Sequence, residues 1–205
     1  MTQTKRIIVA ITGASGAIYG IRALELLQGE RDVETHLILS PSGAQTIAME
    51  TDVSLEDVRA LADVTHAFKN IGAAISSGSF RVDGMLVAPC SIKTLSGIAN
   101  SYDENLIIRA ADVCLKERHP LALMVRETPL HQGHLELMAR VSGYGAFIVP
   151  PVPAFYHRPS TIDDIVTQTV GRALDLLGVE LDVVARWKEN DAETPDAPDT
   201  TANRA

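Results

Sequence analysis

Short apolar runs recur along the chain and alternate with longer stretches in which apolar residues return every three or four positions. The short runs are typical of strands buried on both faces of a parallel sheet, and they span residues 7–12, 34–39, 84–88, 121–125 and 146–149. The intervening stretches of helical spacing span residues 18–27, 42–49, 91–99, 105–117 and 132–141. The alternation predicts an α/β fold, a single Rossmann-like (flavodoxin-like) doubly wound parallel sheet in a three-layer sandwich.

Two further helices have recognisable starts. Ser54 followed by Asp57 is typical of a capping box. In the last helix, apolar residues repeat at helical spacing from Ile162 to Leu177. We expect Ser160 to cap this helix, with Asp163 at the third helical position, and Gly178 to end it.

Composition limits the classes of function. The chain of 205 residues carries a net charge of −8 and has no basic cluster, so we expect no nucleic-acid partner. No apolar run approaches the ~20 residues of a membrane span, so we expect no membrane insertion. The two cysteines form no C-x-x-C pair and no signal peptide is visible, which indicates the cytoplasm. Residues 1–187 are expected to form one domain, and residues 188–205 a disordered acidic tail.

A glycine-containing turn follows the first predicted strand. Gly13 and Gly16 permit a sharp turn, and the N–H groups at the start of the next helix favour an anion. The spacing is not G-x-G-x-x-G, and the second strand ends in Ser40 rather than in an acidic residue that would bind a ribose. The pattern therefore favours a mononucleotide phosphate, such as that of FMN, over NAD. The alternative is a tight strand-to-helix connection that binds nothing.

Polar residues also follow the third strand, at the edge where a parallel sheet binds its ligands. Ser91, Ile92, Lys93 and Thr94 offer hydroxyls, backbone amides and one cation to an anionic or flavin-like ligand. The alternative is an ordinary helix cap beside a surface lysine. We interpret Cys90 as a small packing residue rather than as a nucleophile.

The fourth and fifth strands end in similar candidates. Arg126 and Glu127 can hold a phosphate and relay a proton, or they can form a surface ion pair. Residues 150–157 form a proline-rich, aromatic loop in which the Tyr156 hydroxyl could reach a phosphate. The alternative is a stiff connection between a strand and a helix.

The remaining polar residues carry weaker signals. Lys116, at a predicted helix end, can simply complement the helix dipole, and Arg172 is by default a solvated side chain. His131 and His134 lie three residues apart with Glu136 nearby, but no third ligand follows at a convincing spacing. We therefore predict no metal site.

Several segments, taken in order, resemble the flavin prenyltransferases of the UbiX/Pad family, which are related to flavin-containing cysteine decarboxylases. The resemblance covers nearly all of the predicted domain. It is most specific at residues 12–17, 50–52, 77–79, 90–99, 105–118, 126–130, 155–157 and 186–187. The stretch before Ser77 lacks a tryptophan that some members have.

The resemblance implies an activity and partners. Members join dimethylallyl phosphate to N5 and C6 of reduced FMN, and the prenylated FMN serves a separate UbiD-type decarboxylase. They assemble from trimers into dodecamers with active sites at subunit interfaces. One alternative is a non-catalytic FMN-binding subunit of an aromatic-acid decarboxylase complex. Another is an FMN-dependent decarboxylase of peptidyl cysteine, whose characteristic motifs are absent here.

The resemblance also implies roles for individual residues. FMN would be held by Gly13, Ala14, Ser15, Ser40, Ser91, Ile92, Lys93, Thr94 and Arg126. The prenyl phosphate would be surrounded by Lys116, Arg126, Tyr156 and Arg172, with Arg109 nearby. The catalytic set would be Ser15, Glu127, Glu50 and Lys116. Within that set, Ser15 and Glu127 would relay protons, and Glu50 is expected to come from a neighbouring subunit. The chemistry requires no metal.

Overall fold

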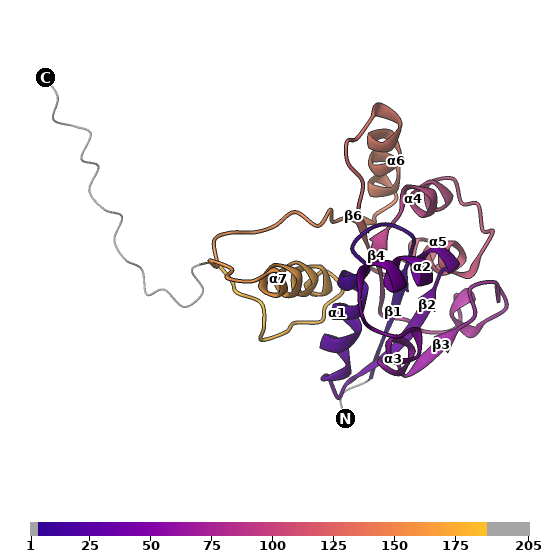
Figure 1. Ribbon diagram of the computed structural model, residues 1–205. Coiled ribbons are helices and arrows are strands. Elements are labelled where there is room, and N and C mark those ends of the chain that lie inside the picture. The colour runs from indigo at the N-terminus through magenta and orange to yellow at the C-terminus, as the bar shows by residue number, and fades with distance from the viewer. Residues whose placement is uncertain (1–3, 188–205) are drawn as a thin grey trace, which may run out of the picture.

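A single parallel sheet organises the chain (Figure 1). The computed structural model describes residues 4–187. Its six strands are β1 (Lys5–Ile11), β2 (Val33–Leu39), β3 (Val64–His66), β4 (Gly84–Cys90), β5 (Leu121–Val125) and β6 (Phe147–Ile148), in the order β3-β2-β1-β4-β5-β6. All the pairs are parallel. The predicted doubly wound α/β fold is therefore confirmed.

The edge strand β3 was not predicted. It contains three residues, and pairs with β2 through His36 and Val64, Leu37 and Thr65, and Ile38 and His66. The five predicted strands alone have the flavodoxin-like order, and β3 extends it to the order of the dinucleotide-binding Rossmann sheet.

Helices connect the strands and cover both faces of the sheet. The α-helices of the described residues are α1 (Ala17–Gln28), α2 (Pro41–Glu50), α3 (Leu55–Ala60), α4 (Ile92–Ala99), α5 (Leu106–Glu117), α6 (Gln132–Gly143) and α7 (Ile162–Asp175), and a 3₁₀ turn, η1, spans Ala74–Ser76. None of these helices is long and apolar enough to cross a membrane. The predicted acidic tail, residues 188–205, lies outside the described residues.

The capping predictions had different outcomes. Ser54 caps α3 as predicted, because its hydroxyl oxygen accepts the N–H of Asp57 at 3.0 Å. The predicted cap of α7 was wrong by one residue. Thr161 accepts the N–H of Asp164 at 3.0 Å, and the Asp164 carboxylate accepts the N–H of Thr161 at 2.9 Å. Ser160 lies just outside the helix and also donates to Asp164.

The central strand β1 supplies both cores. Ile7, Val9 and Ile11 pack on one face with α1 and α7, whereas Ile8 and Ala10 pack on the other face with α4, α5 and α6. All five residues are fully buried. Because the sheet is covered on both faces, ligands can reach it only at its edges and ends, and the carboxyl ends of the strands meet at one end.

Candidate functional site

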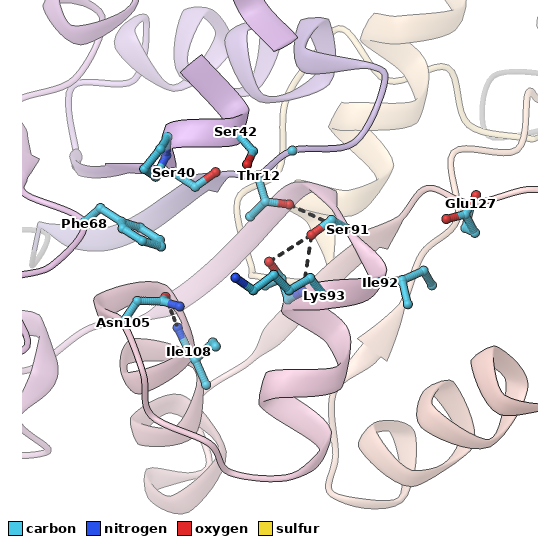
Figure 2. A pocket seen from close by; sticks show the side chains of 13 residues that line it. Thr12, Ser40, Ser42, Phe68, Ser91, Ile92, Lys93, Asn105, Ile108 and Glu127 are labelled. Carbon is cyan, nitrogen blue, oxygen red and sulfur yellow. Dashed lines mark hydrogen bonds between the residues drawn. The ribbon is translucent and has the colours of Figure 1, made fainter. Parts of the chain in front are cut away.

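A cavity of about 530 Å³ lies at the carboxyl ends of the strands (Figure 2). This volume is within the usual range for small-ligand sites. Its lining consists of Thr12, Gly13, Ser40, Pro41, Ser42, Phe68, Ser91, Ile92, Lys93, Thr94, Asn105, Ile108 and Glu127. The structure thus brings together predicted residues from the ends of four strands.

Buried Thr12 ties two sides of the cavity together. Its hydroxyl donates to the carbonyl of Pro89 at 2.7 Å. It also accepts the N–H of Ser91 at 2.8 Å (Figure 2). Ser91 in turn caps α4, since its hydroxyl oxygen accepts the N–H of Thr94 at 3.3 Å. These bonds fix the predicted Ser91–Thr94 segment against the end of β1.

The glycine turn packs tightly against the start of α2. A Cβ atom on Gly13 would lie 2.3 Å from Cβ of Ser42, so only glycine fits here. Gly16 has a φ of 99°, which glycine adopts without strain. Ser40 caps α2 by accepting the N–H of Gly43 at 2.9 Å, which leaves its hydroxyl proton free for another acceptor.

The anion at the start of α1 comes from the chain itself. One carboxylate oxygen of Glu50 accepts the N–H of Gly16 at 2.8 Å and that of Ala17 at 3.1 Å. Burial alone would raise the pKa of Glu50, but bonds from the Ser15 side chain and these two amides, with the charge of Arg126, lower it below its ordinary value. The expectation that these amides hold a ligand anion was therefore wrong. Glu50 makes these contacts within its own subunit, although a neighbouring one was expected to supply it.

Arg126 and Glu127 follow β5 as predicted. The N–H of Arg126 donates to the carbonyl of Cys90 at 3.1 Å. Glu127 lines the cavity, and its Oε1 accepts the N–H of Thr128 at 3.0 Å. Burial raises the pKa of the Tyr19 hydroxyl, and the nearby charge of Arg126 opposes that rise. Arg126 thus lies near both Tyr19 and Glu50, on the α1 side of the site.

Arg109 and Lys116 do not line the cavity of their own chain. Arg109 donates to Ser76, Asp103 and Asp112 on the outer side of α5. Lys116 pairs with the adjacent Glu117 at the C-terminal end of α5. This position is roughly 16 Å along the helix from the end that borders the cavity.

Tyr156, in the loop before α7, and Arg172, on α7, also lie away from this cavity lining. The Tyr156 hydroxyl donates to the carbonyl of Ala185 at 2.9 Å and accepts from Gln168 at 2.7 Å. Arg172 lies one helical turn after Gln168 and pairs with Asp175, so both predicted phosphate ligands share one side of the helix. Arg172 is half-exposed.

Two other interpretations can be compared with the structure. Cys90 is fully buried, and burial raises the pKa of its thiol to about 12, so the assignment to packing is confirmed. His131 caps α6 and stacks near His134. Within residues 4–187, no group of three or more His, Cys, Asp or Glu side chains is arranged to hold a metal ion.

The sequence prediction missed part of the lining. The additional residues are Thr12, Pro41, Ser42, Phe68, Asn105 and Ile108. Asn105 carried a usable signal, because asparagine directly before a helical stretch is a strong N-cap. Phe68 carried none, since it comes from the loop after the unpredicted strand β3.

Residues 1–174 match the Flavoprotein family. The flavin prenyltransferase UbiX of Escherichia coli strain K12 is 59% identical over 186 residues, which are 90% of this chain and 98% of that one. The chain belongs to the flavin prenyltransferase family. The protein is therefore an enzyme of the flavin prenyltransferase type.

Two solved structures are also similar. The dodecameric FMN-dependent UbiX-like decarboxylase from Escherichia coli O157:H7 is 50% identical with a TM-score of 0.87, covering 89% of this chain and 98% of that chain. AnUbiX (PadA1), in complex with FMN and dimethylallyl pyrophosphate, is 49% identical with a TM-score of 0.88, covering 93% of this chain and 100% of that chain.

The residues around the cavity fit a flavin mononucleotide. Phe68 and Ile108 offer apolar surface to a flat ring system, while Ser40 and Lys93 offer a hydroxyl donor and a cation to a phosphate. Ser40 follows β2, at the position where an NAD-binding site has an acidic residue that binds the ribose. The donor set is therefore that of an FMN site.

Proposed function

We propose that this enzyme binds reduced FMN in the cavity and transfers the dimethylallyl group of dimethylallyl phosphate to its N5 and C6 positions. The observation that carries the proposal is Glu127, a carboxylate that lines a cavity whose other polar residues are hydroxyls, an amide and one cation. When bound, reduced FMN supplies the electron-rich atoms that accept the dimethylallyl group.

The chain's own residues supply the rest of the chemistry. Cleavage of the allylic C–O bond leaves negative charge on the phosphate, and preorganised cations stabilise such charge. Arg126, Arg172, Lys116 and Arg109 are our candidates, with the Tyr156 hydroxyl as a further donor. Glu127 would move a proton at the flavin, and Ser15, whose hydroxyl is bonded to Glu50, would assist.

Assembly would complete the site. None of the proposed phosphate ligands lines the cavity of its own chain: Arg109 and Lys116 lie on α5, Arg172 on α7, and Arg126 beside Glu127 after β5. A similar protein of solved structure is dodecameric. We therefore infer a homo-oligomer, a dodecamer by analogy, in which α5 and α7 of neighbouring subunits face the cavity. A separate cytoplasmic UbiD-type decarboxylase would receive the product.

The deciding experiment incubates the purified protein with reduced FMN and dimethylallyl phosphate and then analyses the released flavin. A mass increase by one dimethylallyl group, with a changed absorption spectrum, is expected. Unmodified FMN, together with copurification of a decarboxylase at fixed stoichiometry, would instead indicate a non-catalytic flavin subunit. Release of carbon dioxide from a cysteine-ended peptide without any partner would indicate a cysteine decarboxylase.

A further inference from the structure

The occupied start of α1 raises the question of where the FMN phosphate binds. The Gly16 and Ala17 amides, which such a turn normally offers to a phosphate, already bind the Glu50 carboxylate. A second anion beside that carboxylate would be repelled. The phosphate must therefore bind elsewhere along the cavity.

Asn105 provides an alternative donor at the start of α5. Its Oδ1 accepts the N–H of Ile107 at 3.0 Å and of Ile108 at 3.2 Å, and these two bonds fix the orientation of the amide. The side-chain nitrogen Nδ2 then has no partner within the part of the chain that the structure describes. Asn105 is only 8% exposed and lines the cavity. Because this largely buried side chain lines the cavity, an acceptor bound there is the natural complement of its Nδ2 donor.

The surroundings of Asn105 favour a negatively charged acceptor. Figure 2 shows Lys93, Phe68 and Asn105 on the side of the cavity away from Glu127. The dipole of the twelve-residue helix α5 adds partial positive charge at the same place. An elongated flavin nucleotide whose reacting ring lies near Glu127 would therefore carry its phosphate to the Asn105 side.

We propose that Asn105 donates a hydrogen bond from Nδ2 to a phosphate oxygen of FMN and thereby selects FMN over riboflavin. Its Oδ1 keeps the helix cap while Nδ2 binds the ligand, so one side chain performs both tasks. The inference rests on the proposed function only in requiring that the cavity holds FMN.

The test compares flavin binding to the oligomeric apoprotein by fluorescence titration, using FMN and riboflavin. Ser and Asp cap helices about as well as Asn, so Asn105→Ser and Asn105→Asp both preserve the cap. Asn105→Asp has no donor at this position, and Asn105→Ser replaces Nδ2 by a hydroxyl on a side chain one bond shorter. Asn105→Ser is expected to weaken FMN binding by roughly ten- to a hundredfold, because a hydrogen bond to a charged group is lost. Riboflavin binding should change by less than about threefold, within the context dependence of a single neutral contact.

Asn105→Asp places a carboxylate against the phosphate, so its FMN affinity should fall further than that of Asn105→Ser. Both apoproteins should melt near the wild-type temperature, whereas Asn105→Ala, which lacks the cap, should melt lower. Equal losses for FMN and riboflavin, or unchanged FMN affinity in the Ser and Asp variants, would overturn the proposal. Failure of the wild-type protein to bind FMN would instead refute the proposed function.

Discussion

Glu50 occupies, at the scale of single residues, the place where a βα turn usually presents its backbone amides to a ligand. Sequence pattern predicts the turn because Gly13 and Gly16 follow a buried strand. The pattern does not show that the end of α2 returns a carboxylate to that turn, because this contact joins residues 34 positions apart. The same carboxylate accepts a hydrogen bond from the Ser15 side chain, so the donors of this turn already bind Glu50. A ligand anion would then need other donors in the cavity.

Replacing Glu50 should therefore destabilise the protein. Glu50→Ala removes the acceptor of two helix-start amides and should lower the free energy of unfolding at pH 7 by about 0.5–1 kcal/mol, a small figure because the group is exposed. Since folding lowers the pKa of Glu50, its contribution is present above the unfolded pKa near 4.5 and is lost as pH falls through the folded value.

Urea unfolding at pH 7 and at pH 3.5 measures both effects. The difference between wild type and Glu50→Ala should shrink at the lower pH. Glu30→Ala is the control, because Glu30 lies in the turn after α1 with no side-chain bond or ion pair among residues 4–187. An equal loss in the control would show that Glu50 has no special role.

Glu127 supports a catalytic prediction. Glu127→Gln keeps a side chain of nearly the same shape in the cavity, so FMN should bind within about threefold of wild type, while prenyl transfer should fall at least a hundredfold because no carboxylate can move a proton. Single-turnover rates across neutral pH measure the effect. Glu136→Gln, on α6, is the control variant. An unchanged rate in Glu127→Gln would exclude the proton-transfer role.

At the scale of elements, β3 shows what limits prediction from sequence. Four of the five predicted strands contain a run of buried apolar residues, and such runs are visible in the chain. The fifth, β6, has only two residues, both apolar, one exposed and one half-buried. The three residues of β3 contain only one apolar side chain and none is fully buried. Contacts distant in sequence hold this strand in place: Asp63 accepts from Thr35, and His66 Nε2 lies 2.9 Å from His36 Nδ1.

The histidine pair makes the edge of the sheet sensitive to pH. His36 is buried between His66 and Glu34, with Asp63 and Arg6 nearby. Burial, together with the charge of His36, lowers the pKa of His66. A lowered histidine pKa means that stability is complete above the unfolded value near 6.5 and is lost as pH falls towards the folded value. Protonation of both rings would also place two N–H donors against each other.

The melting temperature of the wild-type protein should therefore fall between pH 7.5 and pH 5.5, above the range in which Glu50 and Asp63 titrate. His66→Gln keeps a polar group opposite His36 without the ionisable ring, and should show a smaller fall over this interval. His119→Gln, a variant at a histidine after α5, should retain the wild-type slope. Identical slopes for wild type and His66→Gln would refute the assignment.

At the scale of the whole molecule, the chain separates residues that the chemistry requires together. The cavity-lining residues meet at the carboxyl ends of the strands, where sheet topology alone predicts a site. Arg172 lies on α7 and Tyr156 in the loop before it, and α7 packs on α1 at one face of the sheet (Figure 1). Topology within one chain could not predict their partner, because contacts between subunits leave no periodic signal in the sequence. The role of Arg172 was suggested only by the resemblance, whereas the aromatic loop after the fifth strand also suggested one for Tyr156.

A substitution of Arg172 tests whether this residue binds the prenyl phosphate. Arg172→Ala removes a charged donor, so use of the prenyl phosphate should weaken by roughly ten- to a hundredfold, while FMN affinity should stay near the wild-type value. Steady-state kinetics with varied dimethylallyl phosphate, beside an FMN titration, separates the two. If Arg172→Ala abolished FMN binding but preserved prenyl-phosphate affinity, Arg172 would belong to the flavin site.

Mixed oligomers then show whether Arg172 serves its own subunit or a neighbour. In Glu127→Gln every cavity lacks the proposed proton-transfer group, and in Arg172→Ala every α7 lacks the proposed phosphate ligand. If the two residues of one site come from different subunits, co-refolding equal amounts should restore about one site in four, because the intact residues then combine at random in a symmetric assembly. If both came from one subunit, every site would retain one defect, and the mixture would be no more active than the average of the separate variants. Activity above that average, matched by light scattering to a single oligomer size, is the outcome expected from the separation of α7 and the cavity in this fold.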